Sequence, residues 1–399
     1  MRSQRVKVLV IEHSLPYYHV PVWTEIACHP AIELTVAYGK GFFTGPNGVP
    51  EGCVNPEIGF DTVVEPSIMR KIVGKTLLWH QAALQELQQT RYDVVIHQFE
   101  TKILSLWKVR RLQRKRGQRF VLWGIGESLH PTPVLDYVRR RLARRADALI
   151  FYAEQNRERY RKMGIEPGKL FVARNLIDIE PIKAAIKSWD TVRLSEFRAD
   201  HRLEQGPLLL SVGRLSQRKR LDLLLKAVPK LLPDYPQLRV AIIGEGPEMT
   251  PLKTLADELA ITDSVSFTGR ISVEKEVAPW FLTADLVIAP GQIGHLATHA
   301  HAYGVPLITG NERNVQGPEI EILLQGDTGL TYEFGNVDAL AAVICKLLAD
   351  ESRRKEMSLR AAARADEYCS VEKMAAGFIE AVLHVTNLEG GCEADYPES

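Results

Sequence analysis

Cysteine, long apolar runs and catalytic signatures are all scarce in this chain of 399 residues. Its five cysteines include no C-x-x-C pair, which argues against a zinc knuckle or a redox dithiol, and a sparse, odd set suits a reducing compartment. No apolar stretch approaches the roughly 20 residues of a membrane-spanning helix. The apolar run 8–11 is too short for the core of a signal peptide and is typical of a first strand. We therefore expect a cytoplasmic protein, bound to a membrane surface at most.

Net charge is also small, at +1, but it is unevenly distributed. Residues 1–180 contain 27 lysines and arginines against 18 aspartates and glutamates, a net charge of +9, whereas the remaining residues carry −8. The basic excess is concentrated in residues 108–119 and 139–145. Such runs favour an anionic partner, such as a phospholipid surface or a lipid phosphate. Solvated helix faces explain the same runs equally well.

The chain is too long for one ordinary hydrophobic core, so two domains are expected. Short β-rich runs alternate with helical patterns in the first half, which predicts a parallel sheet with helical crossovers. The expected strands of this half are 6–11, 32–39, 92–97, 118–126, 146–153 and 169–175, and two of its expected helices are 77–90 and 134–145.

A second unit of the same kind begins near Gly206. Its expected strands are 208–213, 238–244, 264–269, 285–290 and 305–310, and its expected helices include 221–232, 248–260 and 337–350. We expect an N-terminal domain at 1–180, a linker at 181–206 and a C-terminal domain at 207–365. A C-terminal helix at 366–386 is expected to pack back on the N-terminal domain, followed by a disordered tail at 387–399. The fold class is thus α/β, with two Rossmann-like domains.

Two cations follow an expected strand of the second domain. The strand ends at Gly213, and Arg214 and Lys219 then lie in a short polar loop before a helix. Ligands of parallel sheets bind at the carboxyl ends of the strands. A guanidinium grips phosphate oxygens as a planar fork, and an ammonium adds a point charge. The pattern favours a diphosphate site, although a surface loop with two salt bridges is the alternative.

A glycine-containing loop follows the expected strand 285–290. Gly291 and Gly294 allow a flexible loop, and a helix beginning after it offers free amides suited to phosphate. His295 and His299 lie four residues apart, on one face of that helix. They are a weak candidate pair for zinc, because the H-E-x-x-H pattern is absent, and we expect both to lie on the donor side, next to the diphosphate site. Packing against a neighbouring helix is the structural alternative for His299.

Two further turns complete the pattern. The segment 244–247 reads G-E-G-P, which indicates a tight turn and lacks the full dinucleotide fingerprint. Glu319 follows a Gly-Pro turn and begins a short helix. Its carboxylate can accept hydrogen bonds from sugar hydroxyls, or it can simply complement the helix dipole.

Taken in order, the segments VGRLSQRKR, GEGP, VSFTGR, ADLVIAP, HAHAYGVP and PEIEILLQGDTG resemble the retaining glycosyltransferases of the GT-B fold, in the group 1 class of family four. This resemblance covers about 130 residues. It implies two domains facing across a cleft, a nucleotide sugar as donor substrate, a saccharide or lipid-linked acceptor, and no cofactor or metal. The other glycosyltransferase fold typically carries D-x-D, which is absent here.

The resemblance also implies residue roles. Arg214 and Lys219 would hold the donor diphosphate, Gly294 would lie near the phosphates, and Glu319 would lie near the donor. The family usually has two glutamates, eight residues apart, and here Gly291 and His299 occupy those places. The chain resembles a bacterial sub-branch with histidine at the second place, so we expect His299 to contact the ribose.

The N-terminal domain resembles the family more loosely, and its usual glycine-rich loop is absent. We expect His13, after the first strand, and Gly126 and Glu127, in the segment 123–128, to form a wall of the cleft. No catalytic nucleophile is identified, which agrees with a front-face mechanism in which the departing phosphate helps to deprotonate the acceptor.

Three other functions remain open at this point. They are a sugar-nucleotide epimerase on the same scaffold, a non-catalytic nucleotide-sugar-binding protein and a nucleic-acid-binding protein. The last is disfavoured because the basic runs lack interleaved aromatic residues.

Overall fold

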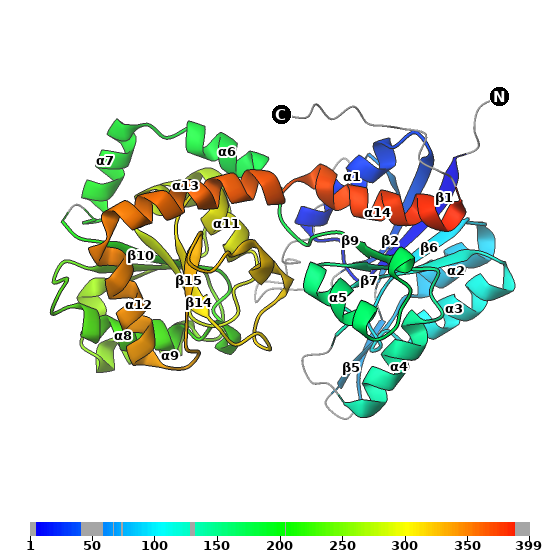
Figure 1. Cartoon of the computed structure of the whole chain (residues 1–399), viewed down its shortest axis with the longest axis horizontal. Helices are drawn as coiled ribbons and strands as arrows, with labels where there is room; N and C mark the ends of the chain where they lie inside the picture. The colour runs from blue at the N-terminus through cyan, green and yellow to red at the C-terminus, as the bar shows by residue number, and fades with distance from the viewer. Residues whose placement is uncertain are drawn as a thin grey trace. The chain divides into compact units, whose positions relative to one another are not determined.

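The chain forms two compact units in a computed structural model, which describes residues 5–40, 59–66, 68–72, 75–127, 132–203 and 205–387. Unit 1 comprises the described residues up to Asn175 together with those from Val371 onward, and unit 2 runs from Leu176 to Ser370. Figure 1 shows both units, each with a central sheet between helices. The prediction of two Rossmann-like α/β domains is confirmed.

Unit 1 is built on a seven-stranded sheet in the order β3-β2-β1-β6-β7-β8-β9, and every neighbouring pair is parallel. Apolar, β-branched residues fill these strands because both faces of the sheet are covered. The strands are β1 (Val6–Glu12), β2 (Ile32–Lys40), β3 (Asp61–Pro66), β6 (Val94–Gln98), β7 (Arg119–Gly124), β8 (Ala148–Phe151) and β9 (Leu170–Val172). A separate antiparallel pair is formed by β4 (Ile68–Ile72) and β5 (Lys75–Trp79).

Helices cover both faces of this sheet. One face is covered by α1 (Val20–Cys28) and α14 (Val371–Thr386), and the other by α2 (Gln81–Gln89), α3 (Ser105–Lys115) and α4 (Pro133–Ala143). The remaining helices of the unit are α5 (Glu154–Lys162) and the short 3₁₀ turns η1 (Tyr17–His19) and η2 (Pro167–Lys169). On the α1 face Trp23, Trp123 and Phe378 pack edge to face, with ring centroids 4.9 to 5.5 Å apart.

Unit 2 contains a six-stranded parallel sheet in the order β12-β11-β10-β13-β14-β15. Counted from β10, this is the order 3-2-1-4-5-6 of dinucleotide-binding folds, with its switch point between β10 and β13. The strands are β10 (Leu208–Val212), β11 (Arg239–Ile243), β12 (Val265–Gly269), β13 (Leu286–Ala289), β14 (Leu307–Gly310) and β15 (Gly329–Tyr332).

One face of the unit 2 sheet packs against α8 (Leu221–Leu231), α9 (Met249–Glu258) and α12 (Val337–Ala349), which share a continuous apolar core with it. The other helical segments are α6 (Glu180–Lys187), α7 (Thr191–Asp200), α10 (Glu274–Thr283), α11 (Leu296–Ala302), α13 (Glu351–Tyr368) and the 3₁₀ turns η3 (Gln217–Lys219), η4 (Thr262–Ser264) and η5 (Pro318–Ile322). None of the helices in the described ranges is long and apolar enough to cross a membrane.

Two segments differ from their sequence-based predictions. The helix expected over 77–90 starts only at Gln81, because residues up to Trp79 pair with β4 instead. The stretch 181–206, expected to be a linker, forms α6 and α7 within unit 2. Burial of Ile182 explains the position of α6, and an edge-on contact of Phe197 with Trp280, at 5.0 Å, anchors α7. The structure places α14 in unit 1, while 388–399 of the expected tail lies outside the described residues.

Candidate functional site

The loops that follow β10 and β13 are joined at the switch point of unit 2. The N–H of Gly291 donates to the carbonyl oxygen of Lys219 at 3.0 Å, and the N–H of Gln292 donates to that of Arg218 at 2.8 Å. A β-carbon on Gly291 would lie only 2.2 Å from the oxygen of Arg218. Because any other side chain would push the two loops apart, glycine at 291 is a requirement of this junction.

Lys219 is the best-defined cation of the junction. Its Nζ donates to the carbonyl oxygen of Ile293 at 3.0 Å. Burial lowers the pKa of Lys219, and the negative charge of Glu319 opposes that shift. A β-carbon on Gly294 would lie 3.3 Å from Nζ, so the ammonium covers that glycine. The structure therefore brings Lys219, Gly294 and Glu319 together, and their binding of a donor remains a prediction.

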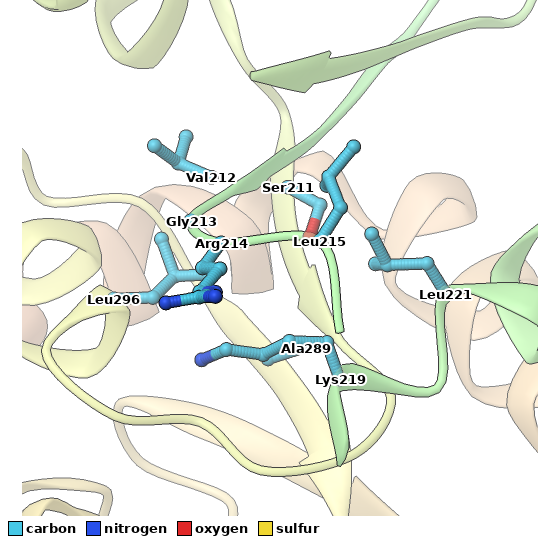
Figure 2. A pocket seen from close by; sticks show the side chains of 9 residues that line it. All are labelled: Ser211, Val212, Gly213, Arg214, Leu215, Lys219, Leu221, Ala289 and Leu296. Atoms are coloured by element: carbon cyan, nitrogen blue, oxygen red, sulfur yellow. The ribbon is translucent and has the colours of Figure 1, made fainter. Parts of the chain in front are cut away.

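Arg214 lies on the same side of the junction. Figure 2 shows its guanidinium and the Lys219 ammonium on the side of the hollow where Leu296 lies. The two cations line one hollow with Ser211, Gly213, Ala289 and Leu296. Two positive charges at the carboxyl ends of parallel strands can hold a phosphate or diphosphate group.

The G-E-G-P turn packs against the backbone of the loop after β10. A β-carbon on Gly246 would lie 2.1 Å from the carbonyl oxygen of Leu215, and the N–H of Leu215 donates to Glu245 at 2.8 Å. The turn thus holds the backbone beside Arg214, which agrees with a structural role.

Glu319 is buried in η5, with 8% of its surface exposed. A β-carbon on Gly317 would lie 2.2 Å from Oε2 of Glu319, so this side chain folds back over its own turn. Its negative charge acts on Lys219. The carboxylate is therefore placed beside the cation, and the sugar contact expected of it remains a prediction.

His299 is engaged within unit 2. Its Nδ1 lies 3.2 Å from the carbonyl oxygen of His295, and its Nε2 lies 3.5 Å from Oε2 of Glu274. The ring stacks on Phe281 with centroids 5.9 Å apart, and the hydroxyl of Tyr303 donates to Glu274 at 2.6 Å. These contacts favour the packing alternative for His299, while its ribose contact remains a prediction.

Glu274 itself was missed by the sequence reasoning. Burial opposes ionisation of its carboxylate, but His299 and Tyr303 hold the pKa of Glu274 below its usual range. Glu274 lies 25 residues before His299 and on another helix, so the sequence around His299 could not predict this contact. Within the described residues, no group of three or more histidine, cysteine, aspartate or glutamate side chains is placed to hold a metal ion.

The three predicted residues of unit 1 lie at the carboxyl ends of its strands. The backbone N–H of His13 donates to Oε1 of Gln98 at 3.2 Å, and Nδ1 of His13 lies 2.6 Å from the same oxygen. Gly126 accepts a hydrogen bond from the hydroxyl of Tyr160 at 2.7 Å. Glu127 pairs with Arg159 at 2.8 Å and accepts a hydrogen bond from Asn156 at 3.2 Å. Gly126 and Glu127 thus contact α5, whereas His13 contacts β6.

A buried polar cluster beside His13 was not predicted. Glu12 is fully buried, and its carboxylate contacts Nδ1 of His19 at 2.7 Å and accepts from Nε1 of Trp23 at 3.2 Å. Nε2 of His19 lies 3.3 Å from Oδ1 of Asn175. Charged groups are rarely buried without partners, and Glu12 has two. All of these contacts lie within unit 1.

A known protein family matches the part of the chain that contains the loops after β10 and β13. Residues 195–364 match the family model for glycosyl transferases, group 1. This region, which is less than half of the chain, is similar to the group 1 glycosyltransferases. A curated relative of this class is the GDP-mannose-dependent α-(1-6)-phosphatidylinositol monomannoside mannosyltransferase of Mycobacterium tuberculosis, 27% identical over 235 residues. That match covers 56% of this chain and 58% of the relative, so the chain spans less than two thirds of the relative's length.

Solved glycosyltransferase structures share the fold. HepE of Anabaena, solved in complex with UDP, has a TM-score of 0.69 at 16% identity, covering 94% of this chain and 99% of that one. A glycosyltransferase of Rickettsia africae has a TM-score of 0.71 at 14% identity, covering 96% of this chain and 99% of that one. At these identities the likeness concerns the group 1 glycosyltransferase fold, of the GT-B class, and not the substrates.

Proposed function

We propose that this chain is a glycosyltransferase that moves a sugar from a nucleoside diphosphate sugar to an acceptor hydroxyl. The observation that carries the proposal is the junction at the switch point of unit 2, where the partly desolvated Lys219 ammonium lies beside Arg214. No metal is needed in this proposal, because the two cations supply the positive charge.

The chemistry of the leaving group explains why fixed cations matter. When the bond between the anomeric carbon and the phosphate oxygen breaks, negative charge grows on the departing diphosphate. Cations already held in place stabilise that charge without reorganising at the moment of reaction. Lys219 is held by Ile293, so its position does not depend on the ligand. An ammonium has three N–H donors, and Ile293 uses one of them.

We further propose that transfer proceeds with retention of anomeric configuration. In the front-face route, the acceptor hydroxyl approaches from the side of the departing phosphate, which takes its proton. This route assigns no protein nucleophile. Proton NMR of the product, recorded before any mutarotation, measures the anomeric configuration, and an inverted product overturns this part of the proposal.

Donor and acceptor are proposed from the relatives. The mycobacterial relative uses GDP-mannose and acts on a phosphatidylinositol mannoside, and the Anabaena protein binds UDP-glucose. We propose a GDP- or UDP-hexose as donor and a glycolipid or polysaccharide precursor as acceptor.

A lipid-linked acceptor also suits one face of unit 1. The exposed residues at 104–115 and 134–145, on α3, α4 and the residues next to them, form what we call the basic face. Arg110 of α3 connects to the segment after α4 by donating to the carbonyl oxygen of Arg145 at 2.6 Å. The basic face consists of Leu104, Trp107, Lys108, Arg111, Arg114 and Lys115 together with Val134, Tyr137, Arg140, Arg141, Arg144 and Arg145. We propose that it contacts an anionic membrane, with exposed apolar residues near the start of each helix and basic residues toward its end.

Lys219→Met and Arg214→Ala test the donor site. Hydrogen bonds to charged groups contribute about 1.5–3 kcal/mol, so each variant should bind UDP or GDP at least about tenfold more weakly by calorimetry. Lys230→Met is the matched control, because Lys230 pairs with Asp338 at 2.7 Å on the exposed side of α8. Unchanged affinity in both site variants rules out this diphosphate site.

Turnover assays with GDP-mannose and UDP-glucose distinguish the remaining functions. A transferase releases nucleoside diphosphate and glycosylates an added acceptor. An epimerase alters the donor without an acceptor, and a binding protein leaves it unchanged. Neither of these alternatives is favoured by the relatives.

A further inference from the structure

Gln316 sits at the centre of the hydrogen bonds that hold the loop after β13. It lies between β14 and η5, and its side chain reaches back to the loop 291–293. Its Oε1 accepts from the N–H of Ile293 at 3.0 Å, and its Nε2 lies 3.0 Å from the carbonyl oxygen of Gly291. One amide therefore ties both ends of a three-residue loop.

The same amide is fixed to the sheet. Nε2 lies 3.1 Å from Oγ1 of Thr309 and 3.2 Å from the carbonyl oxygen of Gly310, at the end of β14. Thr309 in turn donates to the carbonyl oxygen of Ala289 at 2.8 Å. Since the oxygen faces a donor and the nitrogen faces acceptors, the orientation of the amide follows from its partners.

Ile293 connects Gln316 to the cation. Its N–H is held by Gln316, its carbonyl oxygen by Lys219, and its side chain is fully buried. A shift of this peptide therefore moves the acceptor that holds the ammonium. The N–H groups of Gly291 and Gln292 also bond to the loop after β10, so the loops after β10 and β13 are joined by their backbones.

We infer that Gln316 is a positioning residue of the donor site: it fixes the Ile293 peptide and thereby places Lys219 against the diphosphate. The inference rests on the proposed function. The backbone of the loop at 291–293 is held by hydrogen bonds to Gln316 and to the loop after β10.

Two substitutions of Gln316 separate the effect of losing its hydrogen bonds from the effect of adding a charge. Gln316→Met keeps the length of the side chain and removes all of its polar contacts. Gln316→Glu keeps the shape but turns a carboxylate oxygen toward three acceptors and adds a negative charge near the diphosphate. Once protonated, that carboxyl again offers one donor and one acceptor, as the amide does. The Glu variant should therefore regain affinity as the pH falls.

Calorimetric titration with UDP and GDP, at pH 7.5 and pH 5.5, measures these effects. We expect the Kd of the Met variant to rise at least fivefold over the wild type, by the same factor at both pH values. The Kd of the Glu variant should rise at least tenfold at pH 7.5, and the ratio to the wild type should shrink clearly at pH 5.5. Gln325→Met and Gln325→Glu are controls, because Gln325 accepts from the N–H of Thr331 at 2.7 Å, on β15, and contacts neither loop in the bonds described above.

The outcomes are distinguishable. Wild-type affinity in the Met variant overturns the positioning role. If thermal unfolding shows that the Met variant does not fold, the Glu variant decides, and a Kd ratio that does not change with pH overturns the role. Failure of the wild type itself to bind UDP, GDP or their hexose conjugates overturns the proposed function instead.

Discussion

The switch points of the two units have the same topology and different chemistry. In unit 1 the loop after β1 meets the end of β6 through His13 and Gln98, a contact without a fixed positive charge. In unit 2 the loop after β10 meets the loop after β13 through paired backbone groups, and Lys219 lies on the junction. Sheets of this topology bind ligands at the switch point, and the residues there decide whether the ligand can be an anion.

The charged residues of unit 1 discussed above lie in two places away from its switch-point contact. Glu12 is buried with its partners behind the strand ends, while the basic residues lie outside on α3 and α4. Unit 2 carries the opposite net charge and exposes its donor-site cations in a hollow. Under the proposed function the anionic ligand binds unit 2, and we expect the interior of unit 1 to depend on its polar cluster for stability.

The sharpest test of this contrast is Glu12→Ala. The substitution leaves His19 and Trp23 without their carboxylate partner in the core. Breaking a buried hydrogen-bonded charge typically costs about 3–5 kcal/mol. We expect chemical denaturation to show a loss of that size for unit 1, with unchanged UDP or GDP affinity in protein that remains folded. Glu33→Ala is the control, because its pair with Lys7 is exposed, and its effect should stay within about 0.5 kcal/mol.

Acid should destabilise unit 1 through two buried histidines. Burial lowers the pKa of His97 to about 4 and that of His80 to about 3, and Nε2 of each has no partner among the described residues. Both pKa values lie below the unfolded value near 6.5, so the unfolded chain binds more protons in acid. Stability is therefore complete above about pH 6.5 and falls toward pH 4, by roughly 3 kcal/mol for His97.

Denaturation curves at pH 7 and pH 4.5 measure that loss. His97→Leu should reduce the difference between the two curves. His384→Leu should leave the difference unchanged, because His384 is exposed. Equal acid sensitivity in the wild type and in His97→Leu contradicts this assignment.

Vesicle binding tests the basic face. Each basic residue near an anionic surface contributes about 1 kcal/mol, so Arg111→Ala combined with Arg114→Ala should weaken co-sedimentation with anionic vesicles about tenfold or more at low salt. High salt should weaken the wild type as well. The paired control is Lys346→Ala with Lys355→Ala, which removes two exposed charges from unit 2. Absence of wild-type binding at low salt would mean that the basic face is solvated surface.

The smallest effect concerns His299. If its predicted ribose contact exists, His299→Ala should raise the apparent donor constant and lower Tm by no more than about 4 °C, the scale of 1 kcal/mol. His301 lies on the same helix, fully buried, with Nε2 2.9 Å from Oγ1 of Thr328. His301→Ala should therefore lower Tm more and leave the donor constant alone. A large fall of Tm with unchanged donor affinity in His299→Ala would assign His299 to packing, and Glu319 is then the next candidate.

Sequence patterns predicted what is local. Arg214 and Lys219 directly follow an apolar run and a glycine, so their place at a strand end could be read from the chain. Contacts that join distant segments could not be predicted. Gln316 reaches the loop at 291–293 because β14 lies beside β13, and Glu274 reaches His299 because α10 packs near α11. Both depend on packing that periodicity does not encode.

The domain boundaries show the same limit. Residues 181–206 are polar and weakly patterned, so the sequence did not predict that they belong to unit 2. In the structure Phe197 packs against Trp280 and anchors α7 in that unit. The pattern of α14 predicted a helix, and its apolar face gave no indication that Trp23 and Trp123 are its neighbours.

The position of α14 has a consequence for folding during synthesis. Phe378 completes the aromatic cluster of unit 1, and Gly377 lets α14 approach β9 so closely that a β-carbon there would lie 2.1 Å from the oxygen of Val172. These residues are translated after the whole of unit 2. Synthesis of unit 1 therefore starts before that of unit 2 and ends after it. Unit 2 is the first unit to have all of its residues available for folding. Until α14 emerges, the surface of unit 1 that it covers stays open to water and to chaperones.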